Sequence, residues 1–150
     1  MKKIQKVLVV NCGSSSLKFQ LFDMKGEKML CKGLVERIGI AGSRLVYTKT
    51  GCEKVVREVP MKNHVEAIAQ VMAVLTDEKV GVIKSLTELD AIGHRVVHGG
   101  DKFSAPARIN AAAACVRNLC DVPWKPYLRR PYFRVILRGR AYSYAQPGIV

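Results

Sequence analysis

The chain has 150 residues, a formal net charge of +13 and a hydrophobic fraction of 49%. A chain of this length is typical of one domain, and folding at this size buries roughly two-thirds of the unfolded surface. No stretch reaches the roughly 18 apolar residues of a membrane span. The apolar run Val7–Val10 is also shorter than the roughly 7–15 residues of a signal-peptide core. The sequence therefore predicts a globular cytoplasmic protein without a membrane segment.

The cysteines are odd in number and irregularly spaced, and no C-x-x-C pair occurs. This pattern argues against a disulfide framework, a zinc ribbon and a thioredoxin-like redox site. Reduced structural thiols are the expected state in a cytoplasmic protein. The five are Cys12, Cys31, Cys52, Cys115 and Cys120.

The first fifty residues alternate between short apolar runs and turn residues. The continuous run Val7–Val10 favours a strand that is buried on both faces. After a turn at Gly13–Ser16, apolar and polar residues alternate from Leu17 to Leu21 with the two-residue period of a strand. Further strands are expected at Met29–Val35 and Leu45–Lys49. Together these segments predict an antiparallel meander.

A helix and a further strand follow Pro60. Asn63 with Glu66 three residues later resembles a capping box, and apolar residues then recur at helical spacing. These signals predict a helix over residues 65–76. Strand character returns at Leu89–His98, directly before two glycines. Strands followed by a helix and another strand are typical of a mixed α/β or α+β domain.

The turn after Val10 carries residues that suit a phosphate. Glycine lets the backbone approach closely, successive N–H groups can form an anion nest, and the hydroxyls of Ser14 and Ser16 can donate hydrogen bonds. Lys18 adds a mobile positive charge, and Asn11 adds an amide for a substrate or a metal's water shell. The spacing is neither that of a P-loop nor G-x-G-x-x-G. From composition alone, an ordinary hairpin turn is the favoured interpretation of the segment, because short Gly/Ser motifs often match by chance.

The second group of polar residues is GHRVVHGG, Gly93–Gly100. His94 and His98 have the spacing of metal ligands on a helix, but the β-branched residues between them favour a strand. Four residues along a strand span roughly 13 Å, which is too far for one metal ion. Arg95 and Val97 would point to the same face, and a guanidinium beside a small apolar surface suits a short carboxylate with an alkyl end. The alternative is an ordinary surface arginine.

Both groups lie in segments that closely resemble the N-terminal part of acetate kinase. These are VLVVNCGSSSLKFQLFD, then GLVERIGIAGS, then DAIGHRVVHGGDKFSAPARI, in family order and spacing from about residue 7 to residue 110. The resemblance implies an α/β fold, the ribonuclease-H-like N-terminal half of the actin-like ATPase superfamily. It also implies an ATP:acetate phosphotransferase that forms acetyl phosphate and ADP with Mg²⁺, with propionate as a second substrate. Family members are homodimers whose subunits contain two such halves.

The resemblance also implies roles for the residues that match its motifs. Asn11 would help to bind magnesium and phosphate, Ser14 and Ser16 would lie in the phosphate-facing turn, and Lys18 would contact ATP. Arg95 would bind the acetate carboxylate, and Val97 would line the methyl pocket. The family's catalytic aspartate, transition-state histidine, second arginine and glutamate metal ligand lie beyond the matching segment. No catalytic residue is therefore assigned in this chain.

The composition changes near Asn110. Residues 1–110 hold 18 Lys and Arg against 11 Asp and Glu, whereas residues 111–150 hold 7 against 1 and are rich in proline and aromatic residues. We therefore expect residues 1–110 to form an incomplete kinase-like domain and residues 111–150 to be an irregular tail. Out-of-frame translation of a truncated kinase gene would produce such a break. The alternatives are a non-catalytic fragment and a protein that binds nucleic acid through its basic tail.

Overall fold

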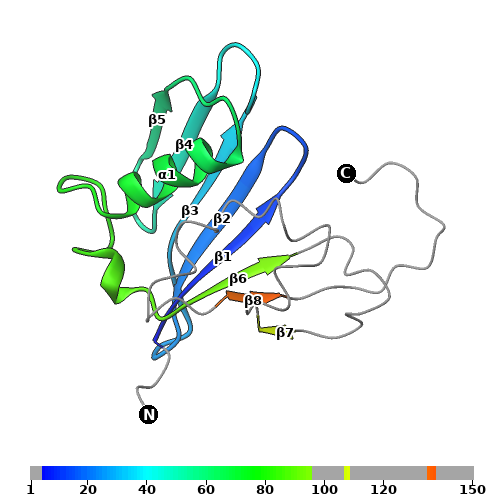
Figure 1. Ribbon diagram of the computed structural model, residues 1–150. Helices are drawn as coiled ribbons and strands as arrows, with labels where there is room; N and C mark the ends of the chain where they lie inside the picture. Colours follow the sequence, from blue (N-terminus) through cyan, green and yellow to red (C-terminus); the bar gives the residue numbers. More distant parts are fainter. Residues whose placement is uncertain (1–4, 96–106, 109–134, 138–150) are drawn as a thin grey trace.

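Short segments of alternating polarity build one mixed β-sheet, on which an α-helix packs (Figure 1). The structure is a computed structural model that describes residues 5–95, 107–108 and 135–137. Within these residues the sheet has eight strands in the order β5-β4-β3-β2-β1-β6-β8-β7. The strands are β1 (Lys6–Cys12), β2 (Leu17–Asp23), β3 (Lys28–Glu36), β4 (Arg44–Lys49), β5 (Lys54–Glu58), β6 (Ala91–Arg95), β7 (Ala107–Arg108) and β8 (Val135–Leu137).

The first five strands form an antiparallel meander in which each strand pairs with the next, and the first four of them are the predicted ones. The chain then passes through the helix α1 (His64–Leu75) and the short 3-10 helix η1 (Leu86–Glu88). It returns as β6, which lies parallel to β1 on the side away from β2. β8 is parallel to β6, and β7 is antiparallel to β8. The crossover through α1 thus places β1 between an antiparallel and a parallel neighbour.

The core lies between α1 and one face of the sheet. Along β2, buried apolar residues alternate with the exposed Lys18 and Gln20, and the buried residues face the helix. The Phe19 ring stacks on the Tyr47 ring with centroids 6.4 Å apart, and the Tyr47 hydroxyl donates to the Val80 carbonyl at 3.0 Å. Fully buried side chains of this size each contribute roughly 1.5–3 kcal/mol. The helix contributes Ala67, Ile68, Val71, Met72, Val74 and Leu75.

The expectation that Val7–Val10 is buried on both faces is wrong. Leu8 and Val10 are fully buried, but Val9 is 39% exposed. Among the described residues α1 covers one face of the sheet, so alternate residues of β1 point to the other face (Figure 1). A continuous apolar run is thus compatible with a half-buried strand. Val9 lies on the face of the sheet opposite α1, two residues before Asn11.

The helix begins and ends one residue earlier than predicted. The Asn63 side chain accepts a hydrogen bond from the Glu66 N–H at 3.0 Å and caps the helix as expected. The Glu66 carboxylate accepts from the Lys62 N–H at 2.7 Å, so the reciprocal half of a capping box to Asn63 does not form.

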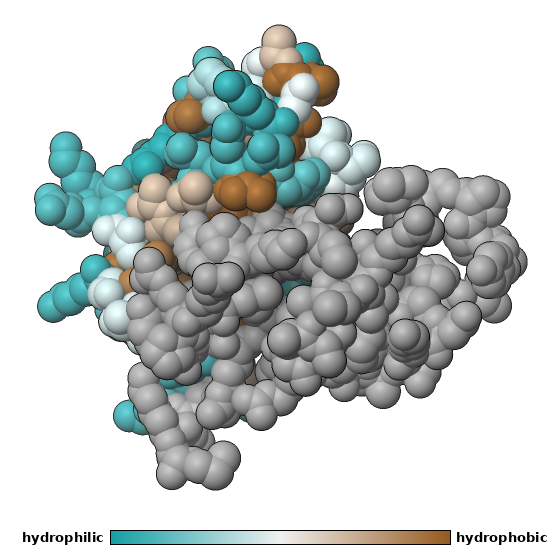
Figure 2. Space-filling model, viewed as in Figure 1, coloured by the Kyte–Doolittle hydropathy of each residue, from teal (hydrophilic) through white to brown (hydrophobic). Residues whose placement is uncertain are grey.

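Hydrophilic residues predominate on the side of the molecule that carries α1, where hydrophobic residues form separate small patches (Figure 2). None of the described helices is long and apolar enough to cross a membrane.

The sequence patterns predicted the bounds or the existence of three strands less well than those of the others. β6 ends at Arg95, inside the predicted strand Leu89–His98, whose last three residues lie outside the described ones. β5 was not predicted, because its sequence KVVRE is charged at both ends and contributes no fully buried residue to the core. β8 corresponds to the apolar run Val135–Leu137, and it pairs with β6 at Ile92, Gly93 and His94.

Candidate functional site

The segment Gly13–Ser16 forms the predicted turn between β1 and β2. The Gly13 N–H donates to the Ser16 carbonyl oxygen at 2.8 Å, and the Ile38 N–H donates to the Ser15 carbonyl oxygen at 2.9 Å. A Cβ atom on Gly13 would lie 2.8 Å from the Ser16 hydroxyl oxygen, so a larger residue would push that hydroxyl aside. The turn is therefore held in one shape by its own hydrogen bond and by the loop after β3.

Three consecutive amides of this turn are available to a ligand. Within the described part of the chain, the N–H groups of Ser14, Ser15 and Ser16 donate to no acceptor. Ser14 and Ser15 are exposed and Ser16 is half-buried, so these amides are not sealed in the core. Successive backbone N–H groups without internal partners are the basis of anion-binding nests. The backbone thus has the donors that a phosphate requires.

The strand register brings three of the predicted site residues to one level of the sheet. Asn11 on β1 lies directly opposite Lys18 on β2 and is also the register partner of Arg95 on β6. Neighbouring strands are about 4.8 Å apart, so the three backbone positions span roughly 10 Å across the end of the sheet next to the turn. Asn11 is half-buried and Lys18 is exposed. Arg95 is placed here by its backbone, and Val97 lies outside the described residues.

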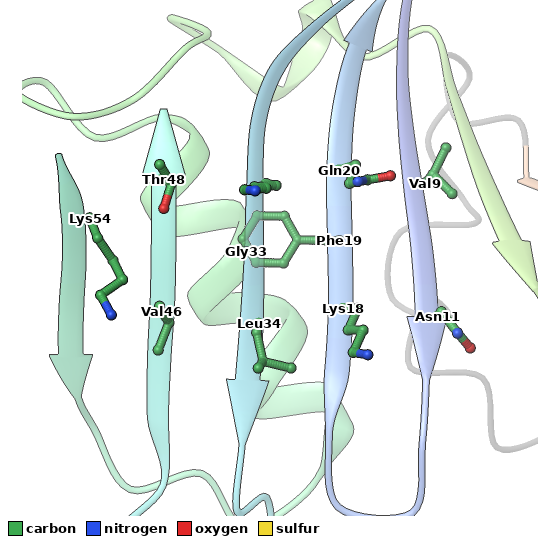
Figure 3. Close-up of a pocket in the computed structure, with 11 residues that line it drawn as sticks. Val9, Asn11, Lys18, Phe19, Gln20, Gly33, Leu34, Val46, Thr48 and Lys54 are labelled. Carbon is green, nitrogen blue, oxygen red and sulfur yellow. The ribbon is translucent and has the colours of Figure 1, made fainter. Parts of the chain in front are cut away.

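An open pocket of about 600 Å³ begins at Asn11 and Lys18 and extends over the face of the sheet opposite α1 (Figure 3). Three lysines line it, and no carboxylate does so among the described residues. Such a pocket is electropositive and attracts anionic ligands. Its lining residues are Val9, Asn11, Lys18, Phe19, Gln20, Lys32, Gly33, Leu34, Val46, Thr48 and Lys54.

Two titratable groups beside the turn are uncharged at neutral pH. Burial raises the pKa of the Cys12 thiol to about 12, so the reactive thiolate is scarce. Burial lowers the pKa of His94 to about 4, and repulsion by His64 acts in the same direction. In the described ranges, no group of three or more His, Cys, Asp or Glu could hold a metal ion. His98, which we did not assign as a metal ligand, lies outside those ranges.

The sequence did not single out His64. Its Nε2 lies 2.7 Å from the Gly13 carbonyl oxygen, a contact between residues 51 positions apart. The only signal in the sequence was its place beside Asn63 at the expected helix start, which indicated a capping region and nothing more. The contact depends on how α1 packs at this end of the sheet, and no local pattern encodes that packing.

Comparison with known proteins agrees with the resemblance seen in the motifs. The model of the Acetokinase family matches residues 6–122. The chain belongs to the Acetokinase family. An acetate kinase from Finegoldia magna is 68% identical over 99 residues, which cover 66% of this chain and 25% of that protein. The chain spans about a quarter of the length of several acetate kinases that it matches.

Solved structures of an acetate kinase and a propionate kinase show the same fold. The crystal structure of Porphyromonas gingivalis acetate kinase has a TM-score of 0.80 and 37% identity, covering 96% of this chain and 42% of its own. A propionate kinase from Francisella tularensis has a TM-score of 0.72 and 27% identity, covering 90% of this chain and 36% of its own. The predicted fold class, an α/β N-terminal domain of the actin-like ATPase type, is thereby confirmed.

Proposed function

We propose that this chain forms the N-terminal part of the active site of an ATP:acetate phosphotransferase, which makes acetyl phosphate and ADP. The observation that carries the proposal is the common level of Asn11, Lys18 and Arg95 beside a turn with three available amides. Phosphoryl transfer requires in-line positioning of the two substrates and neutralisation of charge on the transferring group, and little covalent chemistry from the protein. Amide donors and two cations at one end of the sheet are suited to both tasks.

The ATP phosphates would lie against the turn. Ser14 and Ser16 donate backbone and hydroxyl hydrogen bonds to phosphate oxygens, and the ammonium group of Lys18 reaches them from the next strand. Lys18 is exposed and stands directly across from Asn11, so its side chain is free to follow a bound phosphate. The flexible side chain of Lys18 can stay in contact with the phosphoryl group while this group passes from ATP to the carboxylate.

The carboxylate substrate would lie beside Arg95. A guanidinium binds a carboxylate through two parallel hydrogen bonds, which orient it for attack on the phosphate. Val97 would line the pocket for the methyl group of acetate, and propionate is the second substrate in this proposal. The register of Arg95 with Asn11 supports a short distance between the carboxylate and the phosphate-binding turn.

Asn11 would contribute an amide oxygen to bound Mg²⁺. Magnesium in such sites is usually held by substrate phosphates, water and one or two protein oxygens. The described residues offer no acidic cluster, and this agrees with a metal that arrives with the nucleotide. When bound, the metal neutralises charge on the transferring phosphoryl group. The half-buried Asn11 next to the turn has the right type of oxygen for this role.

Binding of Mg·ATP, measured by calorimetric titration of the full chain, tests the nucleotide site. Lys18→Ala is expected to weaken binding about tenfold, the loss of one charge-assisted hydrogen bond. Lys32→Ala is the matched control, because Lys32 lines the same pocket but pairs with Gln20, two residues along β2 from Lys18. Equal effects of the two substitutions, or no binding by the unaltered chain, would refute the site.

We expect no measurable acetyl phosphate formation by this chain alone. The resemblance places the family's catalytic aspartate and transition-state histidine beyond the segment that this chain matches. Ordinary enzymes turn over at about 1 s⁻¹ or faster, which an acetate-dependent hydroxamate assay detects readily. Turnover at that rate, abolished by Lys18→Ala, would contradict the expectation while supporting the proposed site.

The division of the chain near Asn110 remains a prediction. The family match extends to residue 122, and Val135–Leu137 pairs with β6. Sequencing the coding DNA across codon 110 tests out-of-frame translation, which requires a second open frame that encodes further kinase sequence. A cytoplasmic location is part of the same proposal, because the free thiols Cys12, Cys31 and Cys52 suit a reducing compartment.

A further inference from the structure

The Gly13 carbonyl is held by a side chain from another element. His64, the first residue of α1, places its Nε2 atom 2.7 Å from this carbonyl oxygen. A carbonyl oxygen can only accept, so the imidazole nitrogen must carry the proton and donate it. His64 is half-buried and lies in the first turn of a helix whose inner side is fully buried. Its ring therefore links the turn to a rigid element.

The planarity of the peptide bond transmits this link to the neighbouring amide. In a trans peptide the C=O of one residue and the N–H of the next lie in one plane and point in opposite directions. A Gly13 carbonyl that points at His64 therefore directs the Ser14 N–H away from the helix. This N–H is the first of the three amides that find no acceptor in the described part of the chain. Ser14 itself is exposed, so it lies at a surface that a ligand can reach.

The neighbouring peptides are restrained by other contacts. The Gly13 N–H is used within the turn by the Ser16 carbonyl, and the Ser15 carbonyl is held by the Ile38 N–H. Without a restraint on the Gly13 carbonyl, the peptide between Gly13 and Ser14 could rotate, because glycine has access to a wide range of backbone angles. His64 is the contact among the described residues that removes this freedom.

We propose that His64 is a positioning residue, which fixes the Gly13–Ser14 peptide so that the Ser14 N–H is set to donate to a phosphate oxygen. The inference rests on the proposed function for the identity of the ligand, and on the structure for the restraint itself. Its benefit is preorganisation: an amide that is already oriented loses less conformational freedom when the phosphate binds. His64 touches no reacting atom and acts through the backbone of the turn.

Two substitutions separate the hydrogen bond from the packing of the ring. His64→Leu keeps a side chain of similar size and removes the donor. His64→Gln places an amide N–H at a position similar to that of the imidazole Nε2. Val65→Ala is the control, because Val65 is the next helix residue and is 46% exposed. Urea unfolding followed by circular dichroism shows whether each variant is folded before binding is measured.

Titration with Mg·ATP gives the first readout. His64→Leu should raise the dissociation constant about five- to tenfold, the loss of one well-formed hydrogen bond. His64→Gln should return it to within about threefold of the original value, and Val65→Ala should leave it unchanged. If a folded His64→Leu variant binds as tightly as the unaltered chain, or if His64→Gln is as weak as His64→Leu, the positioning role is wrong.

Nuclear magnetic resonance of the chain without ligand gives the second readout, which does not depend on the proposed function. Long-range proton–nitrogen spectra should show a proton on the Nε2 atom of His64. His64→Leu should shift the amide signal of Ser14, with smaller changes at residues outside the turn. A ring with a proton on Nδ1 and none on Nε2, or an unchanged Ser14 amide, would overturn the inference. If the unaltered chain does not bind Mg·ATP, the proposed function fails and these spectra still decide whether His64 restrains the turn.

Discussion

Protonation of His94 should destabilise the fold in a defined pH range. The residue is 7% exposed on β6, and burial lowers its pKa from 6.5 to about 4. Repulsion from His64 is the smaller cause. In the unfolded chain the ring binds its proton near pH 6.5, so between pH 6.5 and 4 the unfolded state binds more protons than the folded state. The free energy of unfolding is therefore unaffected above this range and decreases as the pH falls through it.

The size of the effect follows from the two pKa values. A shift of this size corresponds to about 3 kcal/mol in total, of which about 2 kcal/mol is lost by pH 5. This is a large part of the stability of a small domain. The lowered pKa values of Asp77 and Glu88 affect stability only at more acidic pH, where these carboxylates begin to be protonated. Measurements above pH 5 therefore separate the contribution of His94 from that of these two carboxylates.

Urea unfolding at a series of pH values from 5 to 7.5, followed by far-ultraviolet circular dichroism, measures this loss. His94→Gln is the comparison, because its side chain is polar and of similar size but does not titrate. The variant should be less stable than the unaltered chain at neutral pH and should show a much smaller dependence on pH. Parallel pH profiles for the two proteins would refute the reasoning, because the loss would then arise from other groups.

The remaining predictions concern packing and charge, and urea midpoints check each of them. Gly33→Ala should destabilise by about 1–3 kcal/mol, because its Cβ would lie 2.3 Å from the Phe19 ring; Phe19→Leu in the same chain should recover part of the loss, and no recovery would contradict the clash. Ile68→Ala should lower the free energy of unfolding by about 2–5 kcal/mol, because Ile68 is fully buried. A smaller loss would mean that the helix moves to fill the cavity. Arg57→Ala removes a partly buried ion pair with Asp77 at 2.6 Å, so its small effect should decrease at high salt; a loss that does not change with salt would point to packing instead.

Local patterns in the sequence were sufficient for most of the elements. The two-residue alternation around Lys18 predicted β2, and the helical spacing after Asn63 predicted α1 to within one residue. These patterns succeed because the pleat of a strand and the turn of a helix set which neighbouring residues share a face. The same local composition identified the turn at Gly13, because glycine and serine mark turns whatever the rest of the chain does.

Contacts between distant segments were decided by the tertiary structure alone. No local pattern places Arg95 beside Asn11, because that pairing depends on the parallel register of β6 with β1 after a crossover. The exposure of Val9 and the contact of His64 with Gly13 likewise depend on where α1 packs. From the sequence alone we predicted which residues bind a phosphate and a carboxylate. The fold decided that they lie together, because sheet register and helix packing are properties of the whole chain and not of any segment of it.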